Sequence, residues 1–311
     1  MKRLVSDLLL SFGALAMQAH AATVGTHGKG FPTATSAAQA LVDAAKSDNT
    51  AELVAILGPS SKDIIVTPDT QADRRIRREF VAKASQKMRV VPVPGRPAEM
   101  TLVAGNDNWP LPIPIVKVGG QWYFDMARGR QAILTRRIGS NEVDAIEVCR
   151  GYVEAQNQFA EMHHTAAGVP YYAQKILSSP GERDGLYWDG EGQDQSPIGK
   201  IIARAISEGY KQGEPYHGYY FRVLTSEGRP DSNTPVSYID KEYMTKGFAL
   251  IAWPARYGVS GVMTFLVNKS GVVYQKNLGP GTSSIASKYP AYRPDTWAPV
   301  STTVAASRDF K

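Results

Sequence analysis

The chain has 311 residues, of which 43% are hydrophobic and 21% charged, and it carries a formal net charge of +6. This composition is that of a globular protein and excludes an intrinsically disordered chain. The positive charge is far below the density of a dedicated nucleic-acid binder, so no nucleic-acid partner is expected. The length suits one large domain or, more usually, two of ordinary size.

The first residues have the pattern of a processing segment. Lys2 and Arg3 precede an apolar run at 8–17, and Ala19-His20-Ala21 is a small-x-small site. This predicts a secretory signal peptide over 1–21, cleaved after Ala21, and a periplasmic or secreted protein. The apolar run is too short to cross a bilayer as a mature helix, so no membrane span is expected after cleavage. Removal of Lys2, Arg3 and Asp7 changes the charge from +6 to +5 (6 − 2 + 1).

An N-terminal α+β domain is expected over 35–139, after a flexible Gly- and Thr-rich lead-in at 22–34. Thr35 or Ser36 is expected to cap a first helix and Thr50 a second. A short strand or turn end is expected at 64–66.

A third helix is expected from Asp69 to Arg89, with Ile76 facing inward. Four arginines are expected to face outward: Arg74, Arg75, Arg77 and Arg78. Such a cluster can grip phosphate or a carboxylated polymer. The favoured interpretation is a solvated face with local ion pairs to Asp73 and Glu79, because the four do not share one side of a helix.

Strands then replace helices. One strand is expected at 100–104, and an edge hairpin at 111–126 turns at Gly119-Gly120. Pro110, Pro112 and Pro114 cannot donate backbone hydrogen bonds, so the first strand of this hairpin is expected at a sheet edge or a bulge. The hairpin is expected to end the first domain.

A long connecting helix is expected over 140–167, starting at Ser140 or Asn141. Cys149, the single cysteine, falls on its apolar stripe, so a buried side chain is favoured over a reactive thiol or an intermolecular link. His163 and His164 end this helix, and because adjacent helical residues point in different directions, no metal site is predicted there.

The polar loop at 178–199 contains aromatic residues and is the predicted ligand-binding surface. The candidate residues are Asp184, Tyr187 and Trp188, together with His217. Two alternatives stay open. The aromatics can instead anchor the loop in the core, and the loop acids can bind calcium, although their spacing does not match the EF-hand pattern.

A C-terminal α+β domain is expected over 168–300, followed by a frayed tail at 301–311. A helix is expected in it from Ser196, with Pro197 in the first position, to its stop at Gly209. Four strands are expected in its last hundred residues, at 219–224, 247–253, 262–267 and 272–276.

Several runs together resemble the exported bacterial proteins grouped as domain of unknown function 2950. They include NWPLPIPIV, RRIGSNEVDAI, HGYYFRVL and GFALIAWPARYGVSGVMTFLVN, and the resemblance covers roughly residues 31–299. It implies export from a Gram-negative bacterium and carries over no activity or catalytic residues. Two fold analogies are weaker: the first half looks like a cystatin-like cone, and the second is similar to the antiparallel sheet of a pilin head.

The predicted fold class is therefore α+β, with helices packed on antiparallel sheets in two subdomains. The preferred function is non-catalytic binding of an unknown envelope ligand or protein partner, with no cofactor. One alternative is an accessory of a pilus-like or secretion assembly. Another is a hydrolase on an envelope polymer, using the acids Glu182, Asp184, Asp189 and Glu191. No catalytic residue is predicted, because Ser260 lacks the nucleophile-elbow spacing and Cys149 lies about 20 Å along one helix from His163.

Overall fold

The computed structural model describes residues 27–188, 196–198, 215–229 and 232–301. The predicted signal peptide and most of the predicted helix from Ser196 to Gly209 lie outside these residues. So do Asp189, Glu191 and Asp194 of the polar loop. Helices and antiparallel sheets make up the described chain, so the α+β fold class is confirmed.

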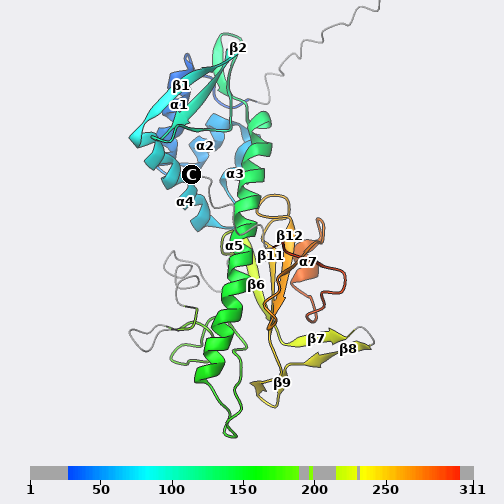
Figure 1. Ribbon diagram of the computed structural model, residues 1–311. Coiled ribbons are helices and arrows are strands. Elements are labelled where there is room, and N and C mark those ends of the chain that lie inside the picture. Colours follow the sequence, from blue (N-terminus) through cyan, green and yellow to red (C-terminus); the bar gives the residue numbers. More distant parts are fainter. Residues whose placement is uncertain (1–26, 189–195, 199–214, 230–231, 302–311) are drawn as a thin grey trace, which may run out of the picture.

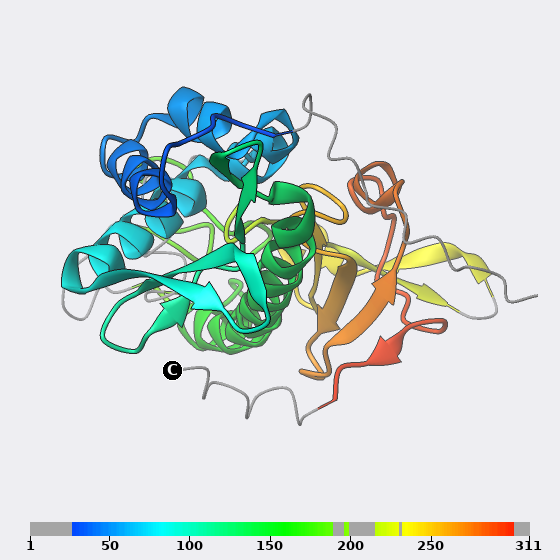
Figure 2. The ribbon, with the colours of Figure 1, turned by 90° about the horizontal axis from the view of Figure 1, so that it is seen from above.

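The organising element is the helix α5, which runs from Met126 to Met162 over 37 residues. At 1.5 Å per residue it is about 55 Å long. In Figure 1 it extends along most of the molecule, and Figure 2 shows it almost end-on, between the N-terminal helices and the C-terminal sheet. Asp125 caps it by accepting the Arg128 backbone N–H at 3.2 Å. The predicted start at Ser140 or Asn141 was wrong, because Gly139 and Ser140 continue the helix instead of starting it.

The N-terminal part places short helices beside a small antiparallel sheet. The helices are α1 (Ala34–Lys46), α2 (Thr50–Leu57), the 3-10 turn η1 (Pro59–Ser61), α3 (Lys62–Ile65) and α4 (Thr70–Gln86). The strands are β1 (Met88–Val93), β2 (Arg96–Ala104), β3 (Trp109–Pro110), β4 (Ile115–Val118) and β5 (Gln121–Phe124). The sheet order is β1-β2-β4-β5, and β3 pairs with β2.

Local sequence explains much of this part. Thr33 and Ser36 form a capping box at α1, so the N-cap is Thr33, two or three residues before the predicted Thr35 or Ser36. The β4–β5 hairpin turns at Gly119-Gly120 as predicted, and both glycines have positive φ. Residues 62–65 are helical, so of the two alternatives for 64–66, a strand or the end of a turn, the strand was wrong. The helix α4 ends at Gln86 because the next residues form β1.

The C-terminal part contains a five-stranded antiparallel sheet in the order β14-β13-β12-β11-β6. Its strands are β6 (Tyr219–Leu224), β11 (Ala249–Pro254), β12 (Met263–Asn268), β13 (Tyr274–Asn277) and β14 (Ala298–Pro299). Two small hairpins pair β7 (Ser226–Arg229) with β8 (Ser232–Ser237) and β9 (Ile239–Asp240) with β10 (Tyr243–Met244). The short helix α7 (Thr282–Ala286) packs against β11. The four predicted strands are confirmed as β6, β11, β12 and β13, with ends shifted by up to two residues.

Two hydrophobic cores share α5. The first half of the helix contributes Met126 and Ile133 to the core under α1 and α2, whereas Ala145 to Phe159 pack into the core of the C-terminal sheet. Cys149 is fully buried in this second core, which confirms its predicted placement. Burial raises the pKa of its thiol to about 12.

None of the helices in the described part of the chain is both long and apolar enough to cross a membrane.

Candidate functional site

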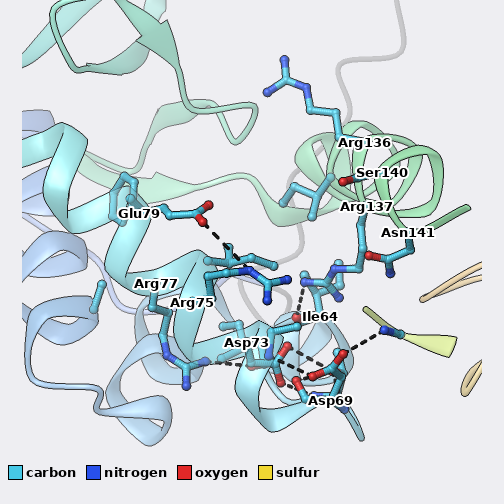
Figure 3. A pocket seen from close by; sticks show the side chains of 18 of the residues that line it. Ile64, Asp69, Asp73, Arg75, Arg77, Glu79, Arg136, Arg137, Ser140 and Asn141 are labelled. Carbon is cyan, nitrogen blue, oxygen red and sulfur yellow. Dashed lines mark hydrogen bonds and ion pairs between the residues drawn. The ribbon is translucent and has the colours of Figure 1, made fainter. Parts of the chain in front are cut away.

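A pocket of about 590 Å³ lies where the N-terminal helices, the first half of α5 and the C-terminal part meet. We call it the junction pocket. Its lining comes from α1 to α4, from segments at 67–69 and 109–113, from α5 between Ile133 and Asp144, and from His217, Gly218 and Ser260 of the C-terminal part. Figure 3 labels charged residues of the pocket in and beside α4 and α5. A volume of this size, at the contact between two parts of a chain, is typical of small-molecule sites.

One wall of the junction pocket is apolar. Helical spacing in α1 and α2 turns Leu41, Leu53 and Leu57 to the same inner side, where Ile64 and Ile113 join them. Each of these five residues is less than 7% exposed and belongs to the N-terminal core. The inner end of the pocket is therefore formed by core side chains.

The helix α4 supplies arginines to the opposite wall. Arg75, Ile76 and Arg77 all line the pocket, but the arginine side chains are only 21% and 13% exposed, whereas Ile76 is 45% exposed. The predicted inward Ile76 and outward-facing arginines at 75 and 77 were therefore wrong. Arg77 is held by Asp48, 2.5 Å from its Nε, and donates to the Ile65 carbonyl at 3.3 Å. Tertiary partners of this kind keep arginine heads on an inner face that periodicity assigns to apolar residues.

Two further arginines come from α5. Arg137 donates from Nη2 to the Ile64 carbonyl at 2.8 Å, while its Nη1 is buried and has no hydrogen-bond partner in the described residues. Burial lowers the pKa of Arg137, and the charge of Asp73 opposes that shift. Arg136 is exposed and lies 5.9 Å from the centre of the Trp109 ring. Within the part of the chain that the structure describes, neither guanidinium has a carboxylate within ion-pair distance.

The carboxylates of the pocket, in contrast, are engaged by donors. Asp73 accepts hydrogen bonds from the Thr67 backbone N–H at 2.7 Å and the Thr67 hydroxyl at 3.0 Å. Burial raises its pKa, which favours the neutral form, and the two bonds from Thr67 oppose the shift. Glu79 lies 4.0 Å from the Nε of Arg75. Both oxygens of Asp73 therefore have donors within the protein, and Glu79 lies beside a cation.

Asp69 joins the two parts of the chain beside the pocket. It is 3% exposed, caps α4 by accepting the Ala72 N–H at 2.8 Å, and accepts the Gly218 N–H at 2.8 Å with its other oxygen. Gly218 has φ +74°, and a Cβ there would lie 2.5 Å from the Asn141 amide nitrogen. Asn141 in turn donates to the Ser260 carbonyl at 2.8 Å. The pocket is thus fixed from the C-terminal side by hydrogen bonds that require a glycine.

His217 stands next to this contact. Its Nδ1 is 2.5 Å from Asp144 Oδ2, and since a carboxylate accepts, Nδ1 carries the proton. Its ring stacks on Tyr216 at 4.2 Å, and its backbone has a positive φ of 47°. Its Nε2 is buried and has no partner among the described residues. A residue held in a strained conformation and oriented by a carboxylate is typical of a functional position.

The other three predicted site residues lie elsewhere. Trp188 is 6.3 Å, ring to ring, from His163 at the C-terminal end of α5, whereas Asp144 lies about 28 Å back along the helix. Tyr187 pairs through its backbone with Ile176 and is half-buried against the C-terminal core.

Asp184 forms an ion pair with Lys175 and accepts the Ser179 N–H at 2.8 Å. The structure therefore does not bring Asp184, Tyr187 and Trp188 together with His217. Their ligand-binding role stays a prediction.

His163 itself packs inward. Its ring stacks on Phe159 at 3.8 Å, and its Nδ1 lies 2.8 Å from the Phe159 carbonyl. Over the described ranges, no group of three or more His, Cys, Asp or Glu side chains is placed to hold a metal ion.

Sequence reasoning missed Arg137, Asp69 and Asp144 as pocket residues. The sequence does show that Asp69 can cap a helix, and that Arg136 and Arg137 form a charged pair next to apolar positions of a helix. Neither pattern shows that the two segments face one cavity.

A family model described as a protein of unknown function (DUF2950) matches residues 28–300. Searches of curated proteins and of solved structures each found no match. The likenesses of the two halves to a cystatin-like cone and to a pilin head therefore stay predictions.

Proposed function

The chain belongs to the DUF2950 family of proteins of unknown function, and we propose that it is an exported protein that binds a small anionic ligand in the junction pocket without transforming it. The pocket is the meeting point of both halves of the chain, and it has the volume and the mixed apolar and charged lining of a ligand site.

One observation carries the proposal: the charged side chains of the pocket differ in whether their polar atoms have hydrogen-bond partners. Asp69, Asp73 and Asp144 each accept hydrogen bonds from the protein, and Glu79 lies beside Arg75. Arg137, by contrast, leaves a buried guanidinium nitrogen without a partner in the described chain.

A buried, unmatched donor of a charged group costs roughly 1–3 kcal/mol or more, which an acceptor on a ligand recovers. Arg136, one residue earlier, adds a second guanidinium that lacks an ion-pair partner among the described residues. A carboxylate or phosphate satisfies the geometry of such groups.

The test compares three variants of the pocket. Arg137→Gln removes the proposed anchor, Arg137→Lys keeps the charge without the planar fork, and Arg78→Gln removes an exposed arginine of α4 as a matched control. Melting temperatures are measured with benzoate, succinate and inorganic phosphate. A ligand at about 100 times its Kd stabilises by about 2.7 kcal/mol, or roughly 5 °C for a chain of this size.

We expect at least one of these anions to raise the melting temperature of the unmodified protein and of Arg78→Gln, to have a smaller effect on Arg137→Lys, and to have none on Arg137→Gln. The proposal is overturned if no probe has an effect, or if Arg137→Gln responds as strongly as the control.

Export is part of the proposal and rests on the pattern of residues 1–21. It is tested by expressing the full sequence in a Gram-negative bacterium and measuring the mass of the protein in the periplasmic fraction. We expect a chain that begins at Ala22. A full-length chain retained in the cytoplasm would contradict export.

A hydrolase is the second candidate, because Asp144 and His217 form an oriented acid–imidazole pair as in hydrolytic sites. One observation ranks this candidate below binding: the hydroxyl of Ser260 already accepts the Arg256 N–H at 2.9 Å and donates to the Arg256 carbonyl at 3.2 Å. A role as an assembly accessory rests on the pilin likeness alone and predicts co-purification with envelope proteins.

A further inference from the structure

We infer that the ligand of the junction pocket is a single-chain amphiphile, with a carboxylate or phosphate head at Arg137 and an alkyl chain along the apolar wall. This inference rests on the proposed function and names the chemical class of its ligand. It follows from the way polarity is distributed along the pocket.

The inner end of the pocket has the character of a protein core. Leu41, Leu53, Leu57 and Ile113 line it, and all four belong to the N-terminal hydrophobic core. Side chains of this kind offer no hydrogen bonds, so a polar ligand group placed there loses its hydration without compensation. An alkyl chain, in contrast, binds favourably there, because its transfer out of water has a favourable free energy.

The charged side lies along α4 and α5. In Figure 3 the side chains of Arg75 and Arg137 point from these two helices into the same space, while Arg136 extends away from them. Arg136 and Ser140 are exposed, so this side opens to solvent. A head group at Arg137 therefore lies between solvent and the apolar wall, which places the chain of the ligand inward.

Charge matching selects the sign of the head. A cationic head would lie beside the guanidinium groups of Arg75 and Arg137, whereas the oxygens of Asp69 and Asp73 already accept hydrogen bonds from the protein. An uncharged chain would leave the buried nitrogen of Arg137 unmatched. An anionic head on an alkyl chain satisfies both ends of the pocket.

The experiment is isothermal titration of the exported protein with hexanoate, octanoate, laurate, dodecyl phosphate and dodecanol, each below its micelle-forming concentration. Burying one more methylene strengthens binding by roughly fourfold. We therefore expect affinity to rise steeply from hexanoate to laurate. Laurate against dodecyl phosphate decides between the two head groups.

Variants separate the head from the chain. Arg137→Gln is expected to weaken laurate at least tenfold while leaving dodecanol unchanged, and Arg78→Gln serves as the control that changes neither. Ile133→Gln, on the half-buried lining of α5, is expected to weaken every long chain and to leave benzoate unchanged. Quenching of Trp109, which lines the pocket, reports occupancy, and Trp109→Phe removes that signal without removing the heat of binding.

The outcomes distinguish the two proposals. If benzoate or phosphate binds with dependence on Arg137 but affinity does not rise with chain length, the amphiphile inference fails and the proposed function stands. If dodecanol binds as tightly as laurate, recognition of an anionic head is refuted. If none of the probes binds, both proposals fail.

Discussion

Replacing Gly139 by alanine is expected to stabilise the protein. Gly139 lies in the interior of α5, and a Cβ at this position would meet nothing within 4 Å. Glycine inside a helix is less favourable than alanine by about 1 kcal/mol, because its backbone loses more freedom on folding. With no contact to oppose that gain, Gly139→Ala should raise the free energy of unfolding by close to 1 kcal/mol and the melting temperature by roughly 2 °C.

Gly129, on the same helix, provides the opposite expectation. A Cβ there would lie 2.8 Å from Cγ1 and 2.9 Å from Cα of Ile113, so part of the obstacle is backbone. Overpacking of this kind costs about 1–3 kcal/mol, which exceeds the gain in helix propensity. Gly129→Ala should therefore lower the free energy of unfolding by up to about 2 kcal/mol and disturb the pocket wall at Ile113.

Urea unfolding followed by circular dichroism measures both changes, provided that the slope of free energy against urea is unchanged. Equal or lower stability of Gly139→Ala would show that α5 is interrupted near residue 139, as expected from sequence. Equal effects of the two substitutions would refute the close approach of Gly129 to Ile113.

Three further outcomes follow from buried groups. Asp69→Ala should lower the free energy of unfolding, measured in urea, by about 2–4 kcal/mol, because it removes a helix cap and leaves the Gly218 N–H without its acceptor. The matched cap variant Asn49→Ala should lower it by about 1 kcal/mol. Equal losses in the two variants would refute the hydrogen bond between Asp69 and Gly218. The hydrogen bonds from Arg128, at 2.8 and 2.9 Å, hold the pKa of Glu99 below its ordinary 4.5. A carboxylate whose pKa is lower in the folded than in the unfolded protein stabilises the fold at pH values above its unfolded pKa. Glu99→Gln should therefore lower the free energy of unfolding by about 1 kcal/mol at pH 7, after allowance for solvent screening, and this loss of stability should shrink as the pH falls below 4.5. A loss that does not change with pH would contradict the ion pair. The Cys149 thiol, buried and with its pKa raised to about 12, should resist iodoacetamide at pH 8 until the protein is unfolded, and labelling of the folded protein would contradict its burial.

The parts of the fold that sequence predicted are those governed by local periodicity. The strands β6, β11, β12 and β13 carry apolar residues over lengths too short for a helix, and Gly119-Gly120 fits a two-residue hairpin turn. Cys149 was placed correctly because the second half of α5 packs against one sheet along a regular stripe.

The errors occur where local patterns compete with tertiary contacts. Gly139-Ser140-Asn141 has the composition of a helix start, yet Asp125 provides the cap that α5 uses. Likewise, the apolar Ile76 was expected inside, and Arg77 takes the inner position because Asp48 and the Ile65 carbonyl receive its guanidinium. Both partners lie outside the helix, so the spacing of apolar residues in α4 could not predict them.

The junction pocket was missed for the same reason: it forms through tertiary contacts between distant segments of the chain. Its apolar wall comes from α1 and α2, its arginines from α4 and α5, and its closing contacts from residues 217, 218 and 260. No window of sequence contains these groups together. What marks the pocket as a binding site is a difference between neighbours: Asp69 and Asp73 have their donors within the protein, and Arg137 retains a buried nitrogen without an acceptor in the described chain. The Asp69–Gly218 hydrogen bond forms only when both halves are docked on α5, so Asp69→Ala, by loosening the docking, should weaken laurate binding as well as stability. Undiminished affinity in that variant would show that the pocket does not depend on the contact between the two halves.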